Sequence, residues 1–248
     1  MNGEHLFSAW IGRLLNYPKY SWKFIDPDTG EIREWQASLD LKIKAVCESC
    51  NSGWMSRLET EAKYALSDMI KYGSKMSLLP RGIATLSAFA FKSAVIATCM
   101  NRNHEPFFTR ADRENFRSSQ SLPSKVQMWI SCLQDIAMTG TFIGHVFGLN
   151  VPSGTNRHGI QIDDLESYAF TYSAGYLAFQ VLACRHGKIA NRGKPLPILR
   201  PNLGWDDAVV QFWPHSGAPI TWPPLLNLNS DSLNALANRW RNAITFLP

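Results

Sequence analysis

A pair of cysteines at the start of an amphipathic segment constrains this chain more than any other feature. Cys47 and Cys50 have the spacing of a zinc knuckle, a tight turn that brings two thiolates onto one ion. Asn51 follows the second cysteine without a gap. Over residues 54–70, apolar side chains recur every three or four positions, with mostly polar side chains between them. This pattern predicts a cysteine turn that leads directly into an amphipathic helix.

The segments on either side of the cysteine turn predict a small structural unit. Residues 39–45 alternate apolar and polar side chains with period two, which indicates a strand running into the turn. We expect Asn51 or Ser52 to cap the helix, and Gly73 to end it. Strand, turn and helix then form a ββα-like unit, to which an earlier arm of the chain contributes His5.

Composition sets the class of protein. The chain has 248 residues, of which 45% are hydrophobic and 18% charged, so it is expected to be globular, with one or two domains. No window approaches the roughly 18 uninterrupted apolar residues of a membrane span, and the start of the chain lacks the features of a signal peptide. We therefore expect a cytoplasmic protein that has no membrane partner. The net charge of +5 permits phosphate binding but does not identify a nucleic-acid binder.

The cysteine count bears on how the knuckle is used. Five cysteines occur as one close pair and three single residues, Cys99, Cys132 and Cys184. An odd number with this spacing disfavours a disulfide framework. A metal role for the pair is therefore favoured.

Helices are predicted for much of the first half of the chain. Apolar spacing predicts a short helix after His5 and a mostly buried helix over residues 86–100 that packs on the helix after the cysteine turn, with Lys92 as its one interruption. A turn-rich cluster at residues 26–30 predicts a hairpin loop. Residues 110–117 predict an exposed polar helix.

Strands are predicted for the second half. Short runs rich in β-branched and aromatic residues, separated by turn residues, indicate an antiparallel sheet. The runs span residues 126–133, 141–149, 159–162, 168–172, 176–184 and 209–213. Between two of them, residues 173–175 predict a tight hairpin turn.

The end of the chain and the fold class follow from the same patterns. Ser230 or Asp231 is expected to cap a last helix that extends through Ile244. The predicted fold class is α+β. Residues 1–122 would form the region with the ββα-like unit and its packed helices, and residues 123–248 an antiparallel sheet domain with a C-terminal helix.

One family shares the most specific motif of this chain. Glu4-His5 followed by Cys47-x-x-Cys50-Asn51 resembles the HNH, or His-Me finger, endonucleases, especially the endonuclease VII-type branch. The phrases Gly-Glu-His-Leu-Phe-x-x-Trp and Cys-Asn-x-Gly-Trp-Met-Ser-x-Leu-Glu are similar to those of phage and bacterial HNH proteins. The resemblance covers about residues 3–72 and implies an N-terminal ββα-metal unit.

The resemblance also implies a function and a set of site residues. The chain would be a metal-dependent nuclease, a hydrolase of phosphodiester bonds in DNA, with a role in phage biology or defence. His5 would be the general base, and Glu4 and Asn51 would hold one Mg²⁺ or Mn²⁺ through hard oxygen atoms. Cys47 and Cys50 would bind a separate structural Zn²⁺. We expect His5 and Asn51 to share one pocket, with Glu4 within reach of the same cation.

The chain departs from the family pattern in several places. The first CxxC pair is absent, so the knuckle supplies two of the four ligands that a structural zinc site needs, and zinc is expected to be absent or sub-stoichiometric. The 41 residues between His5 and Cys47, numbers 6 to 46, form a long insertion. Glu4 replaces the commoner Asp, and Lys42 stands near the usual middle Asn.

A second hypothesis remains open. Taken singly, His5 is typical of a structural or surface histidine and Asn51 of a helix cap. Glu59 lies two turns along from Asn51 and could reach the site, but a solvated helix carboxylate is favoured. The chain could then be a non-catalytic module derived from the HNH scaffold that binds a protein or nucleic acid. Retention of Glu4, His5 and Asn51 together favours catalysis, whereas the missing cysteine pair favours the module. The choice between DNA and RNA, the role of the sheet domain and the oligomeric state stay open.

Overall fold

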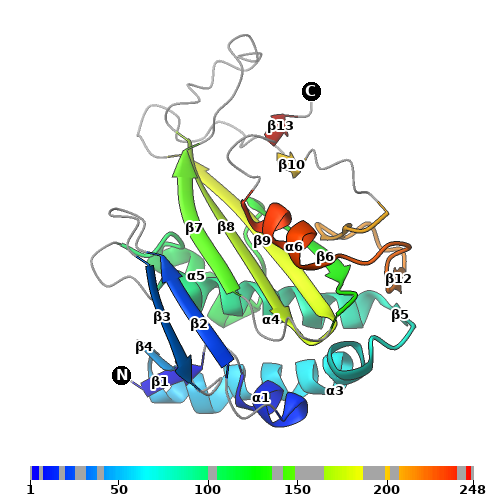
Figure 1. Ribbon diagram of the computed structural model, residues 1–248. Helices are drawn as coiled ribbons and strands as arrows, with labels where there is room; N and C mark the ends of the chain where they lie inside the picture. Colours follow the sequence, from blue (N-terminus) through cyan, green and yellow to red (C-terminus); the bar gives the residue numbers. More distant parts are fainter. Residues whose placement is uncertain are drawn as a thin grey trace.

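The computed structural model describes the chain in residues 2–5, 8–16, 20–25, 32–37, 42–99, 105–135, 142–148, 165–186, 199–201, 207–238 and 244–246. These parts form an α+β protein with antiparallel sheets, as predicted. Figure 1 shows the N-terminal elements (blue) at one end of a large sheet, whose long strands run from them toward the opposite end of the molecule.

Two short strands that are distant in sequence open the fold. β1 (Asn2–His5) pairs antiparallel with β4 (Lys42–Val46), with Glu4 opposite Ile43 and His5 opposite Lys42. Between them lie α1 (Ala9–Leu15) and the antiparallel pair β2 (Tyr20–Ile25) and β3 (Ile32–Ala37). The long insertion is thus a helix and a hairpin attached to the β1–β4 pair. The predicted loop at residues 26–30 lies outside the described residues.

The amphipathic helix begins earlier than predicted. α2 (Glu48–Cys50) continues through the wider turns of η1 (Asn51–Met55) into α3 (Ser56–Tyr72). Asn51 has helical backbone angles, and neither its side chain nor that of Ser52 makes a cap hydrogen bond, so the predicted N-cap is wrong. Asn51 lies within the helix, so its side chain no longer faces the unpaired N–H groups of the first turn. Gly73 ends α3 in the left-handed conformation, φ 61°, as predicted.

The central helix is α4 (Pro80–Thr98), and it is buried almost all round. It packs against α3 and against the large sheet. Lys92, near its middle, is only 2% exposed. β5 (Met76–Leu78), which joins α3 to α4, pairs with β12 (Ile220–Trp222).

The large sheet is antiparallel, as predicted, with strand order β11-β6-β9-β8-β7. Its strands are β6 (Val126–Cys132), β7 (Phe142–Gly148), β8 (Leu165–Ala174), β9 (Leu177–His186) and β11 (Val210–Trp213). The predicted strand at residues 159–162 lies outside the described residues. α5 (Arg110–Ser119) precedes the sheet and begins with a capping box between Thr109 and Asp112.

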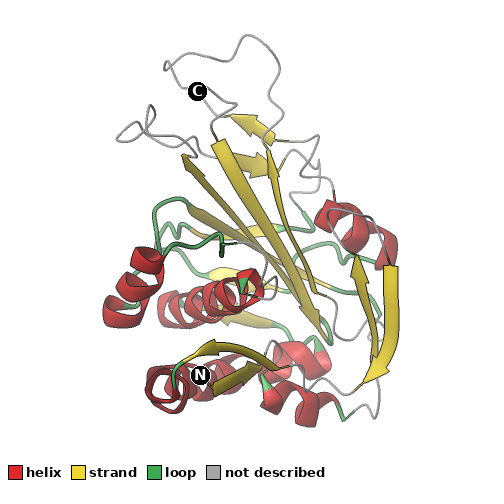
Figure 2. Ribbon diagram, turned by 90° about the vertical axis from the view of Figure 1, so that its left-hand side faces the viewer, coloured by secondary structure: helices red, strands yellow, loops and turns green. Residues whose placement is uncertain are grey.

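The two faces of the sheet are covered by different helices. Side chains alternate along a strand, and in β9 Phe179 and Val181 belong to the same apolar cluster as residues of α3 and α4. From the intervening position, Gln180 donates to the carbonyl oxygen of Leu236 in α6 (Ser230–Asn238), at 3.0 Å. Figure 2 shows the helices on both sides of the long strands. The architecture is therefore helix, sheet, helix.

The last helix is shorter than predicted and is capped by another residue. Asn229 Oδ1 accepts from the backbone N–H of Ser232, at 2.9 Å, so Asn229 takes the capping position assigned to Ser230 or Asp231. Ile244 lies in β13 (Ile244–Phe246), which pairs with β10 (Leu199–Pro201), so extension of the helix to Ile244 is wrong. An apolar residue every three or four positions is compatible with a helix that stops and a short strand that follows.

Buried side chains from both predicted domains join in one apolar cluster. Trp10, Leu66 and Phe89 from the first part meet Phe170 and Phe179 from the second. The division at residues 122 and 123 falls between α5 and β6 in the chain, and it stays a prediction about folding units. None of the described helices is long and apolar enough to cross a membrane.

The β8–β9 turn fixes the sheet to the end of α3. Gly175 has φ 55°, and the next residue, Tyr176, donates its N–H to the carbonyl oxygen of Ile70 at 2.9 Å. A Cβ at position 175 would overlap that same carbonyl oxygen. A tight turn is confirmed, but it consists of Gly175 and Tyr176, because Ser173 and Ala174 of the predicted turn are paired residues of β8. Its glycine is required both by the backbone angle and by the close approach of α3.

Replacement of Gly175 by alanine tests this junction. We expect Gly175→Ala to lower the free energy of unfolding by about 1–3 kcal/mol or more, since it adds backbone strain to a steric overlap. Gly82→Ala in α4 is the control: its Cβ would meet nothing closer than 3.8 Å, and alanine favours a helix by roughly 0.5–1 kcal/mol. Urea denaturation measures both variants, and equal midpoints for the two would contradict the junction.

Candidate functional site

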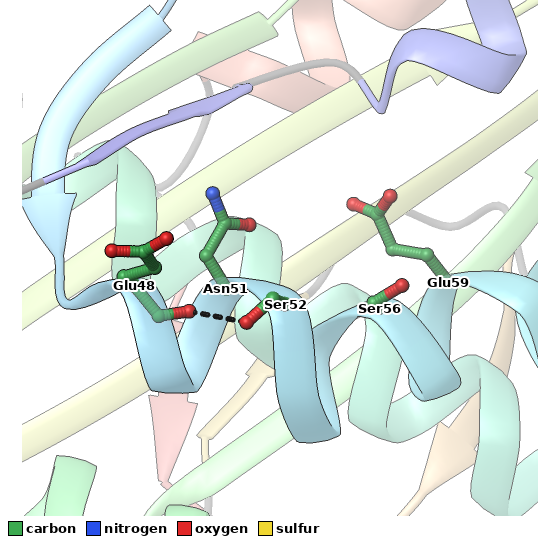
Figure 3. Close-up of a pocket in the computed structure, with 5 residues that line it drawn as sticks. All are labelled: Glu48, Asn51, Ser52, Ser56 and Glu59. Atoms are coloured by element: carbon green, nitrogen blue, oxygen red, sulfur yellow. Dashed lines mark hydrogen bonds between the residues drawn. The ribbon is translucent and has the colours of Figure 1, made fainter.

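The β1–β4 pair brings the Glu4-His5 segment beside the helix that carries Asn51. Asn51 Nδ2 lies 3.4 Å from the carbonyl oxygen of Gly3, the residue before Glu4. Asn51 also lines a pocket of about 250 Å³ together with Glu48, Ser52, Ser56 and Glu59. Figure 3 shows the carboxamide of Asn51 and the carboxylate of Glu59 projecting from the same side of the helix. The pocket wall is thus one helix face rich in oxygen atoms.

Glu4 lies in a buried ionic cluster rather than in this open pocket. Its side chain is only 4% exposed, and its Oε1 is 2.7 Å from Lys92 Nζ. The same ammonium is 2.6 Å from Oε1 of Glu59, which also accepts a hydrogen bond from Ser8 Oγ at 2.6 Å. Lys92 therefore bridges two carboxylates that are supplied by β1 and α3.

Strand geometry separates the neighbours Glu4 and His5. Successive side chains of a strand point to opposite faces, and here Glu4 is buried while His5 is partly exposed. The two side chains nevertheless act on one cluster, because the charge of His5 contributes to the electrostatics of Glu59. His5 also has a further interaction in the folded chain.

The environment of Glu59 favours its ionised form. Burial by itself would raise the pKa of the Glu59 carboxyl, but the charge of Lys92, hydrogen bonds from Lys92 and Ser8, and the charge of His5 lower it below its ordinary value of 4.5. A carboxyl with a lowered pKa in the folded chain stabilises the fold above pH 4.5, and this contribution is lost as the pH falls through the folded-state pKa.

Sequence reasoning missed two members of this cluster. Glu59 was expected to be a solvated helix carboxylate, but it is 24% exposed and bound by both Lys92 and Ser8, so that expectation is wrong. The sequence pattern shows Lys92 only as an interruption of an apolar helix. The sequence feature that indicates its role is the apolar environment, because a lysine surrounded by apolar helix positions is buried and therefore needs a counter-ion.

The cysteine pair brackets α2, since Cys47 precedes the helix and Cys50 is its last residue. The Cys47 and Cys50 Sγ atoms are 3.0 Å apart, and Cys47 Sγ lies 3.2 Å from Ser49 Oγ. All five cysteines of the chain are free thiols. Within the described residues no group of three or more His, Cys, Asp and Glu side chains is arranged to hold a metal ion. The occupancy of the knuckle by zinc stays a prediction.

The two thiols have different acidities. Hydrogen bonds with Ser49 and with Cys50 lower the pKa of the exposed Cys47 thiol to about 7. Burial, followed by the hydrogen bond with Cys47, raises the pKa of the Cys50 thiol above its ordinary value. Burial raises the pKa of Cys132 to about 11 and that of Cys184 to about 12.

The donor types around Asn51 suit a hard cation. Mg²⁺ and Mn²⁺ prefer carboxylate and carbonyl oxygens, and Asn51 has its carboxamide oxygen to offer because the contact with Gly3 uses the nitrogen. Glu4 gives Oε1 to Lys92, which leaves Oε2 as its remaining oxygen. The predicted ligands Asn51 and Glu4 thus have the oxygen atoms that such a cation prefers. Glu4, however, is already paired with the positive charge of Lys92.

In comparisons of the chain with family models, curated proteins and solved structures, nothing matches.

The Lys92 cluster predicts a large stability effect. Lys92→Met would leave the buried Glu4 carboxylate and the partly buried Glu59 carboxylate without their counter-ion, and we expect a loss of about 3–5 kcal/mol in the free energy of unfolding at pH 7. Adding Glu4→Gln and Glu59→Gln to this variant should restore part of the loss by removing the uncompensated charges. Urea denaturation measures each variant, with Lys63→Met on the exposed face of α3 as the control. An unchanged midpoint for Lys92→Met would show that the cluster does not stabilise the fold.

The thiol pKa values predict an order of reactivity. Because the thiolate is the nucleophile, alkylation of Cys47 by iodoacetamide should reach half its maximal rate near pH 7, with Cys50 slower and Cys132 and Cys184 nearly inert. Ser49→Ala should move the midpoint for Cys47 upward, since it removes the largest stabilising hydrogen bond. Peptide mass spectrometry of chelator-treated protein measures the rates. Equal labelling of Cys47 and Cys132 would contradict the assignment.

Proposed function

We propose that this chain is a metal-dependent endonuclease that hydrolyses phosphodiester bonds in DNA. The observation that carries the proposal is the contact between Asn51 and Gly3, because it holds the segment with Glu4 and His5 against the helix that follows the cysteine turn. Antiparallel β1 and β4, followed directly by the helix, also have the order expected of a ββα unit. The resemblance of Glu4-His5 and Cys47-x-x-Cys50-Asn51 to HNH nucleases supplies the reaction class.

Each residue has a distinct task in the proposed reaction. The His5 imidazole takes a proton from the attacking water, as histidine does near neutral pH. The Asn51 carboxamide and the Glu4 carboxylate would hold Mg²⁺ or Mn²⁺, and the nitrogen contact to Gly3 orients the Asn51 oxygen away from β1. When bound, the cation would neutralise the charge that builds on the phosphate and on the departing oxygen.

One observation favours the second candidate, a non-catalytic module that binds a protein or nucleic acid. Lys92 Nζ lies between Glu4 and Glu59 at ion-pair distance from both, so a cation of the chain itself already occupies the space between these carboxylates. A scaffold in which Glu4 serves only to bind Lys92 would keep its fold without a metal-dependent reaction.

Plasmid nicking separates the two candidates. With Mg²⁺ or Mn²⁺ we expect the unmutated chain to nick supercoiled DNA, and EDTA to abolish nicking. His5→Ala should lower cleavage by roughly 10²- to 10⁴-fold with little change in melting temperature or DNA binding, because it removes a positioned proton acceptor. Asn51→Ala should also lose activity. Since Asn51 does not cap the helix, its cost in stability should be small, about 1 kcal/mol or less.

The controls test position as well as chemistry. His215→Ala removes a histidine from the loop between β11 and β12 and should leave nicking unchanged. Cys47→Ser should affect melting temperature more than cleavage if the knuckle holds zinc. If the unmutated chain binds DNA but never nicks it with either cation, and His5→Ala changes nothing, the catalytic proposal fails and the binding module replaces it.

A further inference from the structure

A second and larger pocket lies on the α5 side of the cysteine turn. Its volume is about 610 Å³, and it is lined by residues of β4, of the cysteine turn and the start of the helix that follows it, of α4 and of α5. The volume lies in the range of small-molecule sites, roughly 300–1,000 Å³. Its apolar surface comes from Val46, Trp54, Met55, Val95, Ile96 and Phe116.

The polar part of this pocket is dominated by arginine. Arg110, Arg113 and Arg117 recur at helical spacing on one face of α5, and all three line the pocket. Glu114 also lines it and pairs with Arg110 at 2.7 Å. The lining of the pocket therefore carries an excess of positive charge.

Two of these arginines are free to pair with a ligand. Arg113 donates from Nη1 to the carbonyl oxygen of Phe108, at 3.0 Å, a neutral partner, and it has no ion pair among the residues that the structure describes. Arg117 is exposed, and within the described parts of the chain it has neither an ion pair nor a hydrogen bond; its charge acts on the Cys47 and Cys50 thiols.

We propose that this pocket binds a small amphipathic anion, a hydrocarbon body that ends in a carboxylate or a phosphate. The apolar wall would take the hydrocarbon, and the Arg113 and Arg117 guanidinium groups would pair with the anionic end, which their planar donor arrays suit. A nucleobase fits less well, because its polar edge would be buried against carbon atoms with few hydrogen-bond partners.

This ligand site is separate from the proposed cleavage site and does not depend on cleavage. Asn51 and Glu59 line the smaller pocket only, whereas Arg113, Phe116 and Ile96 line the larger one only. Lys92 lies between them: it lines the larger pocket, while its ammonium faces Glu4 and Glu59.

Calorimetric titration of the full chain tests the proposal. The probes are decanoate and decyl phosphate, with neutral 1-decanol and deoxyadenosine monophosphate as comparisons, all below micelle-forming concentrations. We expect both decyl anions to bind, and the alcohol to bind at least about tenfold more weakly, because a charge-assisted hydrogen bond is lost. Comparing decanoate with decyl phosphate identifies the preferred anionic end.

Variants locate the bound probe. Arg117→Glu should weaken decanoate binding by about tenfold or more, and Arg113→Glu should act in the same direction. Ile96→Trp should block binding by filling the apolar part. Arg57→Glu, an equal charge reversal on the exposed face of α3 and outside the pocket, should leave the affinity unchanged. Arg117 is exposed, so its variant is expected to fold even where Ile96→Trp does not.

Three outcomes would overturn the proposal. The first is decanol binding as tightly as decanoate, which would show that the arginines take no part. The second is an unchanged affinity in both arginine variants. The third is tighter binding of the nucleotide than of either decyl anion, which would make the pocket a nucleotide site. Each outcome leaves the nicking result unaffected, so the two proposals succeed or fail separately.

Discussion

The buried ammonium of Lys92 is the interaction on which the arrangement of this fold depends. It joins α4 to Glu4 of β1 and to Glu59 of α3, segments that are 88 and 33 residues away in the chain. Desolvation of three charged groups is expensive, and their attraction offsets that cost only if the geometry is good. Displacement of β1 or α3 by one residue would leave a charge buried without a partner. The cluster thus selects one register for the first strand against the helices.

The same cluster limits how Glu4 can take part in the proposed reaction. Two carboxylates that converge on a cation are a common feature of metal sites, but here the cation is a side chain of the protein. A divalent ion held by Glu4 has to share that carboxylate with Lys92. Asn51 is under no such constraint, because its oxygen is not used in the contact with Gly3. Of the two residues that would hold the proposed cation, Asn51 is therefore the one whose oxygen is not already engaged by a side chain of the protein.

Periodic patterns were sufficient to predict much of the fold. The 3.6-residue spacing identified α3 and α4, and alternation with turn residues identified the large antiparallel sheet. The start of the helix was not predictable in this way, since Asn51 after a cysteine has the sequence of a cap and yet lies within the helical path. The pairing of β1 with β4 also needs tertiary information, because a helix and a hairpin separate them.

In the candidate site, too, residues close together in sequence were predictable, whereas contacts between distant residues were not. Asn51 and the cysteine turn could be found because their spacing is local, whereas the partners of Glu4 and Glu59 lie on another helix. The sequence indicates that Lys92 is a buried charge that needs a carboxylate partner. It does not indicate which carboxylate is that partner. Its side chain also lines the larger pocket, so it is a shared wall between that pocket and the ionic cluster. Because core side chains are closely packed, a ligand against Lys92 would restrict the motion of the ammonium that holds Glu4 and Glu59.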